Sequence, residues 1–339
     1  MRGGVPGELS IQFLVLNANP TIGSRRLGGV TPGGAASSFP SRGLNRVKLF
    51  SSRRGCVSAL GVVSLVSLVS LVSLAAGPAL AAADKDVFGI TQVYPTRPGG
   101  ETWSLADDAL RDKRFDPQDP ITRNPDGSWK MKNDKVRLQV FTSTGYDSKR
   151  IPTYDPDVLT SRGYMQAAND WKNVEMTGFV KVNAAKDMSD NFAWYARGGR
   201  HNDSLACEGS SYKGSLHYDG RVRWQKETWH VSYEQTAYKT GTSSLKGRWV
   251  GFKSIMRNTK VNGQPAVKLE LWLNENADKV TWKKVYDYTD SGQMGGDTRH
   301  CGGAVNGMPL VWGGPIATFR WDSTSDVDFK WLSVREITE

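Results

Sequence analysis

Cysteine and histidine are both scarce in this sequence, which contains three cysteines and four histidines. No two cysteines have C-x-x-C spacing, so a zinc site is not predicted. The chain also lacks a phosphate-binding glycine loop, a dinucleotide fingerprint, a serine-hydrolase elbow and a metalloprotease helix motif. These absences disfavour nucleotide-dependent enzymes, serine hydrolases and zinc proteases.

Long helical periods are missing after residue 84, and the best helix candidate, Ser104–Lys113, is short. Extended runs recur instead at regular spacing from Asn173 onward, separated by turn signals such as Asn262-Gly263. This spacing predicts an all-β fold, a two-sheet antiparallel β-sandwich or jelly roll. The expected strands are Val174–Val182, Phe192–Arg197, Tyr212–Tyr218, Val222–Lys226, Trp229–Tyr233, Trp249–Met256, Val267–Leu273, Trp282–Tyr288, Ala317–Trp321 and Val327–Glu336.

The N-terminal part of the chain has the layout of a targeting leader. Residues 57–80 are apolar, Arg53 and Arg54 precede them, and small residues follow. This predicts a signal peptide over residues 53–83, cleaved before Ala82 or Asp84, and hence a secreted, extracellular protein. An uncleaved anchor is the alternative, because the apolar run approaches the ~20 residues that span a bilayer. Residues 1–52 are an N-terminal extension with no assigned fold.

Residues 84–339 are expected to form a single domain. As far as about Gly163 they are rich in Pro and Asp, with short extended runs such as Val136–Phe141, so this N-terminal part is expected to be loop-rich. No stable membrane association is expected once the leader is removed.

The net charge of +10 comes mostly from the leader. Residues 1–83 hold eight basic and one acidic residue, which leaves 36 basic against 33 acidic residues, and no nucleic-acid partner is expected. Residues 181–260 still carry 14 Lys and Arg against 7 Asp and Glu. This local excess favours an acidic ligand, with a solvated basic surface as the alternative.

Two cysteines remain after the leader, which contains Cys56, is removed. In an exported protein this pair, Cys207 and Cys301, predicts one disulfide. It would close a loop of 94 residues between positions 207 and 301, worth ~4 kcal/mol in the chain-entropy model. Zinc is the rival, favoured only by His300 beside Cys301.

Three of the four histidines lie between Phe192 and Tyr233, where aromatic and basic residues interleave at strand spacing. Side chains alternate between the two faces of a strand, so Lys213, Ser215 and His217 should share a polar face.

The register of the next strand decides what joins this face. A two-residue turn at Asp219-Gly220 would place Arg221 and Arg223 on the opposite face, with the tyrosines. A longer or bulged loop would place Arg221 or Arg223 beside Lys213 and His217. Tyr195, Arg197 and His230 form the alternative cluster.

Three C-terminal runs, GRWVGFKSIMRN, VKLELWLNENADKVTWKKVYDYTDSG and GGPIATFRWDSTSDVDFKWLSVREI, resemble the closing strands of concanavalin A-like jelly rolls. That superfamily contains lectins, glucanases and alginate-type polysaccharide lyases. The motifs YPTRPGGETW, CEG-x-x-YKG and KETWH also resemble those of secreted proteins of this type. The resemblance covers roughly residues 86–337 and implies a jelly roll that acts on or binds polysaccharide.

A glycoside hydrolase would need two carboxylates across the scissile bond. The E-x-D-x-x-E motif of jelly-roll glucanases is absent, because Trp272 stands where its central Asp belongs. Glu208, Glu227 and Glu234 lack the same-strand spacing and suit salt bridges better. Hydrolysis is therefore a second alternative.

A polysaccharide lyase must neutralise a uronate carboxylate, remove the proton at C5 and protonate the leaving oxygen. The central stretch supplies these residue types, although a lone His is more often structural and Trp194, Trp224 and Trp229 suit a sandwich core. The catalytic candidates are His217, His230, Tyr195 and His201. The substrate-binding candidates are Arg197, Lys213, Arg221, Arg223, Lys226 and Tyr233.

The sequence therefore predicts a secreted protein that cleaves an anionic, uronate-containing polysaccharide by β-elimination. A non-catalytic, lectin-like module is the first alternative, and a surface or adhesion protein would follow from an uncleaved leader. No cofactor is required. A structural calcium at Asp322, Asp326 and Asp328 is an alternative to a polar turn there.

Overall fold

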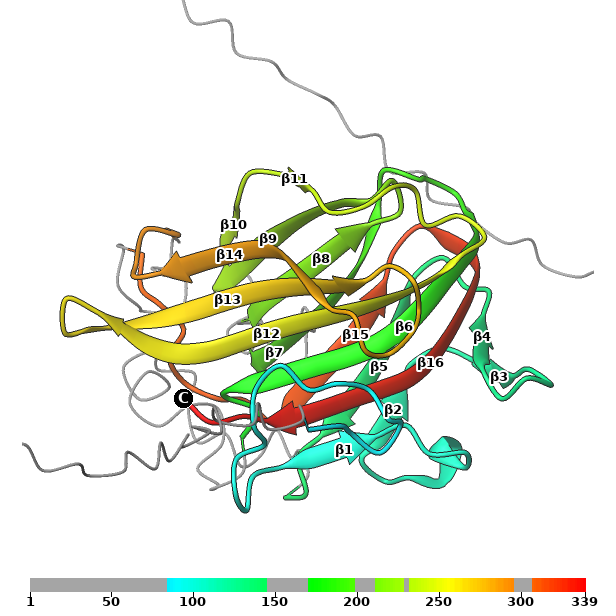
Figure 1. Ribbon diagram of the computed structural model, residues 1–339, viewed down its shortest axis with the longest axis horizontal. Helices are drawn as coiled ribbons and strands as arrows, with labels where there is room; N and C mark the ends of the chain where they lie inside the picture. The colour runs from blue at the N-terminus through cyan, green and yellow to red at the C-terminus, as the bar shows by residue number, and fades with distance from the viewer. Residues whose placement is uncertain (1–83, 145–169, 199–210, 229–231, 296–306) are drawn as a thin grey trace, which may run out of the picture. The chain divides into compact units, whose positions relative to one another are not determined.

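The computed structural model describes residues 84–144, 170–198, 211–228, 232–295 and 307–339. These residues form two antiparallel sheets of eight strands each (Figure 1), which confirms the predicted β-sandwich. The first sheet has the order β14-β13-β12-β6-β16-β4-β3, with β1 paired to β16. Its strands are β1 Thr102–Ser104, β3 Thr122–Arg123, β4 Trp129–Met131, β6 Val174–Ala185, β12 Trp249–Val261, β13 Gln264–Asn274, β14 Lys283–Asp290 and β16 Thr324–Glu336.

The second sheet has the order β10-β9-β8-β7-β15-β5-β2, with β11 paired to β9. Its strands are β2 Phe115–Pro117, β5 Val136–Phe141, β7 Asn191–Gly198, β8 Ser211–His217, β9 Arg221–Thr228, β10 Ser232–Gln235, β11 Lys239–Thr240 and β15 Ile316–Trp321. The helix candidate forms only one 3-10 turn, Ala109–Arg111. Among the described residues, no helix is long and apolar enough to cross a membrane.

The core lies between the sheets and is rich in aromatic residues. Trp194 and Trp224 are fully buried there, as predicted, whereas Trp229 lies outside the described residues. Trp194 packs with its ring 4.9 Å from Phe252 of the opposite sheet, and such pairs add ~0.5–1.5 kcal/mol beyond burial of area. Gly214 faces the same interior, because a Cβ there would lie 2.5 Å from Ser254 Oγ.

The β8–β9 hairpin has the longer of the two predicted loops. Ser215 pairs with Arg223 and Leu216 with Val222, and the Gly220 N–H donates to His217 O over 2.9 Å. Gly220 has φ +96°, a conformation that glycine adopts without steric cost. Arg223 therefore lies on the same face as Ser215, its partner on β8. Lys213 and His217 are two residues before and after Ser215 on β8, so they also lie on this face.

Paired strands of the second sheet align its outward side chains in two cross-strand rows. The first row holds Arg137, Arg320, Ala193, Ser215 and Arg223, contributed by β5, β15, β7, β8 and β9. The second row holds Gln139, Thr318, Tyr195, Lys213, Gln225 and Gln235. The outer face of this sheet is therefore polar across its width, while the intervening residues fill the core.

Candidate functional site

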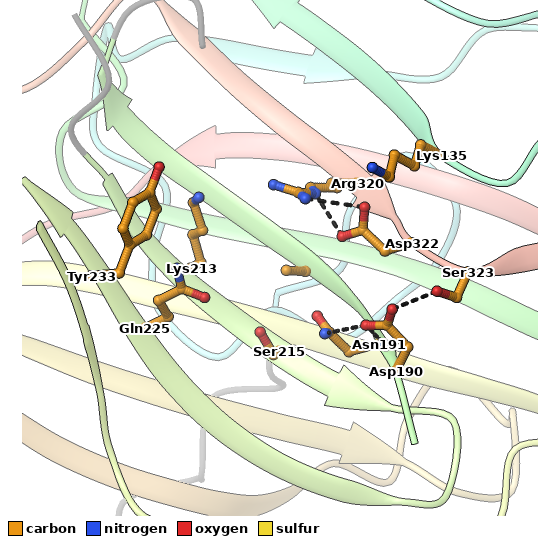
Figure 2. Close-up of a pocket in the computed structure, with 11 residues that line it drawn as sticks. Lys135, Asp190, Asn191, Lys213, Ser215, Gln225, Tyr233, Arg320, Asp322 and Ser323 are labelled. Atoms are coloured by element: carbon orange, nitrogen blue, oxygen red, sulfur yellow. Dashed lines mark hydrogen bonds and ion pairs between the residues drawn. The ribbon is translucent and has the colours of Figure 1, made fainter. Parts of the chain in front are cut away.

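A pocket of about 400 Å³ is hollowed into the outer face of the second sheet (Figure 2). The floor of the pocket is formed by Ala193 and Ser215, two small residues of the first cross-strand row. Their neighbours in the row, Arg320 and Arg223, have much longer side chains. Figure 2 shows Lys213 and Tyr233 on one side of the pocket. The complete lining is Lys135, Asp190, Asn191, Ala193, Lys213, Ser215, Gln225, Tyr233, Arg320, Asp322 and Ser323.

One wall is built around a buried ion pair. Lys213 Nζ contacts Glu227 Oε2, and the two side chains are only 4% and 2% exposed. The Tyr233 hydroxyl donates to Glu227 Oε1 over 3.0 Å, while the Tyr233 residue stays 45% exposed. Lys213 Nζ also lies 5.2 Å from the Tyr195 ring centroid and 5.6 Å from that of Tyr233. A buried carboxylate thus connects an ammonium to an accessible phenol.

Burial changes the acidity of this wall. It lowers the pKa of Lys213 by penalising the charged ammonium, although Glu227 opposes the change. Burial also raises the pKa of Tyr195, against the nearby guanidinium groups of Arg320 and Arg137. Tyr195 is therefore a protonated phenol at neutral pH.

On the opposite wall, Asp322 pairs with a guanidinium and Asp190 accepts hydrogen bonds from neutral groups. Arg320 donates to Asp322 through Nε (2.6 Å) and Nη2 (3.0 Å), which leaves Nη1 available as a donor. Burial alone would lower the pKa of Arg320, but the Asp322 carboxylate outweighs it and raises that pKa. Asp190 accepts from the Asn191 backbone N–H and from the Ser323 hydroxyl, over 2.8 and 2.6 Å.

Several polar groups on this face have no partner within the described residues. Lys135 is exposed and makes no ion pair there, and Ser215 and Gln225 make no side-chain hydrogen bond. Beside the pocket, Arg137 Nε and Gln139 Oε1 are buried without a hydrogen-bond partner. These groups form a set of unused donors and acceptors, as a site for a polar ligand requires.

His217 lies at the end of β8, two residues from the pocket floor. Its Nδ1 is 2.6 Å from Ser189 O, so Nδ1 carries the hydrogen, and Nε2 is left buried without a partner. Burial lowers the pKa of His217, which favours the neutral ring with a free lone pair on Nε2. The Tyr238 ring covers it edge-on at 5.0 Å and also contacts Arg221 and Arg223, at 4.3 and 4.4 Å.

The structure thus brings together Lys213, Tyr195 and Tyr233, with His217, Arg221 and Arg223 farther along the same face. His201, His230, Cys207 and Cys301 lie outside the described residues.

Arg197 was expected to share a strand face with Tyr195 in the alternative cluster, and this placement is wrong. The register between β7 and β15 shifts between Ile316 and Thr318, and Arg197 has φ +80°. This bulge reverses the alternation, so the guanidinium enters the interior and donates to Leu310 O over 2.5 Å. Burial there lowers the pKa of Arg197 to about 10.

Lys226 also points between the sheets, so it does not line the pocket. Its Nζ lies 2.9 Å from Asp290 Oδ2 and donates to Met294 O over 2.8 Å. The Tyr212 hydroxyl donates to the same carboxylate over 2.6 Å. Arg197 therefore binds Leu310, and Lys226 binds Asp290 and Met294, in the interior of the sandwich.

The three aspartates considered for calcium are bound to cations and amides. Asp322 pairs with Arg320, and Asp328 pairs with Lys130 (2.8 Å) and Lys181 (3.0 Å). Asp326 contacts the same Lys130 at 2.5 Å. Over the described part of the chain, no three His, Cys, Asp or Glu side chains gather in a group that could hold a metal ion.

Sequence reasoning missed Lys135, Asp190 and Arg320 as pocket residues. Arg320 alternates with the buried Phe319 and Trp321, so its outward direction was readable from the sequence. The pairing of β15 with β7, which brings Arg320 to the pocket, joins segments more than a hundred residues apart and leaves no local signal.

No protein-family model matches the sequence, and no curated protein matches it. Solved structures resemble the chain weakly. The binding domain of botulinum neurotoxin serotype D/C is 7% identical with a TM-score of 0.35, over 66% of this chain and 44% of that one, so this chain spans less than half of its length. The Crh5 transglycosylase is 8% identical with a TM-score of 0.36, over 72% and 90% of the two chains. Alginate lyase Aly36B, solved with an alginate trisaccharide, is 11% identical with a TM-score of 0.33, over 72% and 98%. With similarities this low, only the site can support a function for this chain.

Proposed function

We propose that the pocket on the second sheet binds a uronate-containing polysaccharide and cleaves it by β-elimination. The observation that carries the proposal is the combination of three cationic side chains around one pocket with an accessible phenol on a buried carboxylate. Lys135, Lys213 and Arg320 supply the cations, and Tyr233 with Glu227 supplies the phenol and carboxylate.

Binding of the uronate carboxylate falls to the cationic groups. Lys135 has no carboxylate partner among the described residues, and Arg320 keeps Nη1 free of Asp322. A guanidinium or ammonium within hydrogen-bond distance would stabilise the negative charge that grows on the carboxylate when the C5 proton leaves. Ser215 and Gln225 are placed to bind sugar hydroxyl groups.

Cleavage then needs two proton transfers. A base removes hydrogen from C5, the C4–O4 bond breaks as the C4–C5 double bond forms, and an acid gives a proton to O4. Tyr233 is suited to be the acid, because its side chain lines the pocket, the residue is 45% exposed, and Glu227 orients its hydroxyl at 3.0 Å. His217, the one histidine in the described part of the chain, could be the base only if Tyr238 moved away from its buried Nε2, which lies outside the pocket lining. His201 and His230 are the other candidates from the sequence.

A hydrolase would use the same pocket differently. It needs two carboxylates that are free to act on either side of the scissile bond. Asp322 is held by Arg320, Glu227 is held by Lys213, and Asp190 accepts hydrogen bonds from three donors, the Asn191 backbone N–H and side-chain amide and the Ser323 hydroxyl. The described carboxylates therefore favour elimination over hydrolysis.

A lectin-like module is the second candidate, because Ser215, Gln225 and Asn191 are neutral groups of the kind that bind sugar hydroxyls without chemistry. The location follows from the leader: we infer secretion after cleavage within residues 53–83, with an anionic polymer as partner and no cofactor. A structural calcium would have to bind away from Asp322, Asp326 and Asp328, which Arg320, Lys130 and Lys181 already hold.

Incubation with alginate, glucuronan, pectin and neutral glucans tests the proposal. The ultraviolet absorbance of unsaturated uronate ends follows elimination, and affinity electrophoresis follows binding. Absorbance growth on one uronate polymer supports the lyase, and retention without product supports the lectin-like module. New reducing ends without absorbance would indicate a hydrolase, and no response to any glycan would refute both main candidates.

A further inference from the structure

The outer face of the first sheet, on the other side of the sandwich from the pocket, has an unusual bulge in β16. The register between β16 and β6 shifts between Lys330 and Ser333, and Trp331 has φ +55°. Phe329 and Leu332 are fully buried on either side. The bulge thus turns two consecutive side chains, Lys330 and Trp331, outward together, where a regular strand would bury one of them.

Positive φ at a tryptophan is a rare and strained conformation. Lys279, which faces the same ring, also has a positive φ, +68°. Strain of this kind costs folding free energy and gathers at ligand sites, so two strained residues in contact call for an explanation beyond packing.

The side chains on this face alternate between ammonium groups and indole rings. Lys330 Nζ lies 4.1 Å from the ring centroids of both Trp331 and Trp249. Lys279 Nζ lies 3.8 Å from the Trp331 ring, and Lys181 Nζ 5.4 Å from that of Trp249. All five side chains are partly exposed. We name this set the tryptophan–lysine patch.

Two ammonium groups of the patch lack a carboxylate partner. Lys279 Nζ donates only to Phe88 O, over 2.9 Å, and Lys330 makes no ion pair with the described residues. The carboxylate that acts on Lys330 from a distance, Asp126, accepts its bonds from Ser128 in its own turn. Partial burial lowers the pKa of Lys330, and the neighbouring ammonium groups of Lys279 and Lys181 lower it further. Lys181 is paired with Asp328, but Lys279 and Lys330 have no ion pair among the described residues, and two such ammonium groups close together favour an anionic ligand.

We propose that the tryptophan–lysine patch is a second binding surface for acidic polysaccharide, which holds the polymer by its anionic groups while the pocket acts on another segment. This inference rests on the proposed function. Lys279 and Lys330 bind carboxylates of the polymer, and the indole edges contact the apolar sides of its sugar rings. Two surfaces on one long polymer raise its effective concentration at the pocket.

The test measures retention in gels that contain alginate, glucuronan or pectin at low salt, in a Tyr233→Phe background so that the polymer stays intact. Lys279→Gln with Lys330→Gln should raise the apparent Kd by about three- to tenfold, the loss expected for two exposed ion pairs. The control, Lys113→Gln with Lys260→Gln, removes the same charge from exposed lysines outside the patch. It should change the apparent Kd less than about twofold, because unpaired surface charges contribute little.

Turnover separates this inference from the proposed function. With Tyr233 intact, the Lys279 and Lys330 variant should cleave a short oligouronide, too short to span both faces, at the wild-type rate. Retention equal to wild type, or equal losses in both double variants, would overturn the patch and leave the pocket standing. A wild-type chain that neither binds nor cleaves any uronate polymer would overturn both.

Discussion

Replacement of Lys213 by Met removes the ammonium from the buried ion pair in the pocket wall. Glu227, which is 2% exposed, then loses the ammonium with which its carboxylate pairs. The Tyr233 hydroxyl still donates to it, and the Met side chain fills most of the space beside the Tyr195 ring. The cost of the substitution is therefore electrostatic rather than a loss of packing.

The size of this cost follows from the burial. Removing one member of a buried ion pair typically costs ~3–5 kcal/mol, because the other charge is left without compensation. The remaining bond from Tyr233 keeps Lys213→Met near the lower end, so we expect a loss of about 3 kcal/mol in the free energy of unfolding. For a domain of this size, that lowers Tm by about 6–12 °C.

Urea unfolding with a double-mutant cycle checks the value. Lys213→Met combined with Glu227→Gln should recover most of the loss, since the stranded charge is gone. A single-variant loss below about 1 kcal/mol, as for a surface pair, or a double variant as unstable as the sum of the single ones, would refute the reasoning.

Three further predictions concern other parts of the molecule. Because burial lowers the pKa of His217, the unfolded chain binds a proton at this residue before the folded chain does, as pH falls below about 6.5. The free energy of unfolding should therefore decrease on acidification below that pH. Urea unfolding of the wild type and of His217→Gln across about pH 5–7 should show a smaller decrease in the variant. Gly214→Ala should destabilise by ~1–3 kcal/mol in the same assay, since its Cβ would lie 2.5 Å from Ser254 Oγ; an unchanged midpoint would show that the sheets can separate there. Mass spectrometry of an unreduced digest of the exported protein should find Cys207 joined to Cys301, and two free thiols would contradict it.

Turn dipeptides and the residue types within strands made much of the fold predictable from the sequence. The Asn262-Gly263 turn joins β12 and β13 directly, with Val261 paired to Gln264 and positive φ at both turn residues, as its sequence indicates. Trp194, expected in the core because aromatic strand residues usually fill a sandwich interior, is fully buried.

Bulges and long-range pairing set the limit of sequence reasoning. Arg197 left the polar face because one extra residue in β7 reversed the alternation, and no local feature of the sequence marks that residue. The Asp219-Gly220 turn left two registers open, and only the structure distinguishes them. The pocket needed Arg320 beside Ala193, a pairing between distant strands.

The most direct test of the pocket as a lyase site is the rate of unsaturated uronate formation by Tyr233→Phe on the polymer that the wild type cleaves. The substitution removes one hydroxyl from a half-exposed residue, so folding should be retained. We predict that kcat falls by ~10²–10⁴, while retention on the intact polymer changes by less than about tenfold, the most that one neutral hydrogen bond contributes. A variant that forms unsaturated ends at the wild-type rate would contradict the assignment of Tyr233 and with it the proposed site.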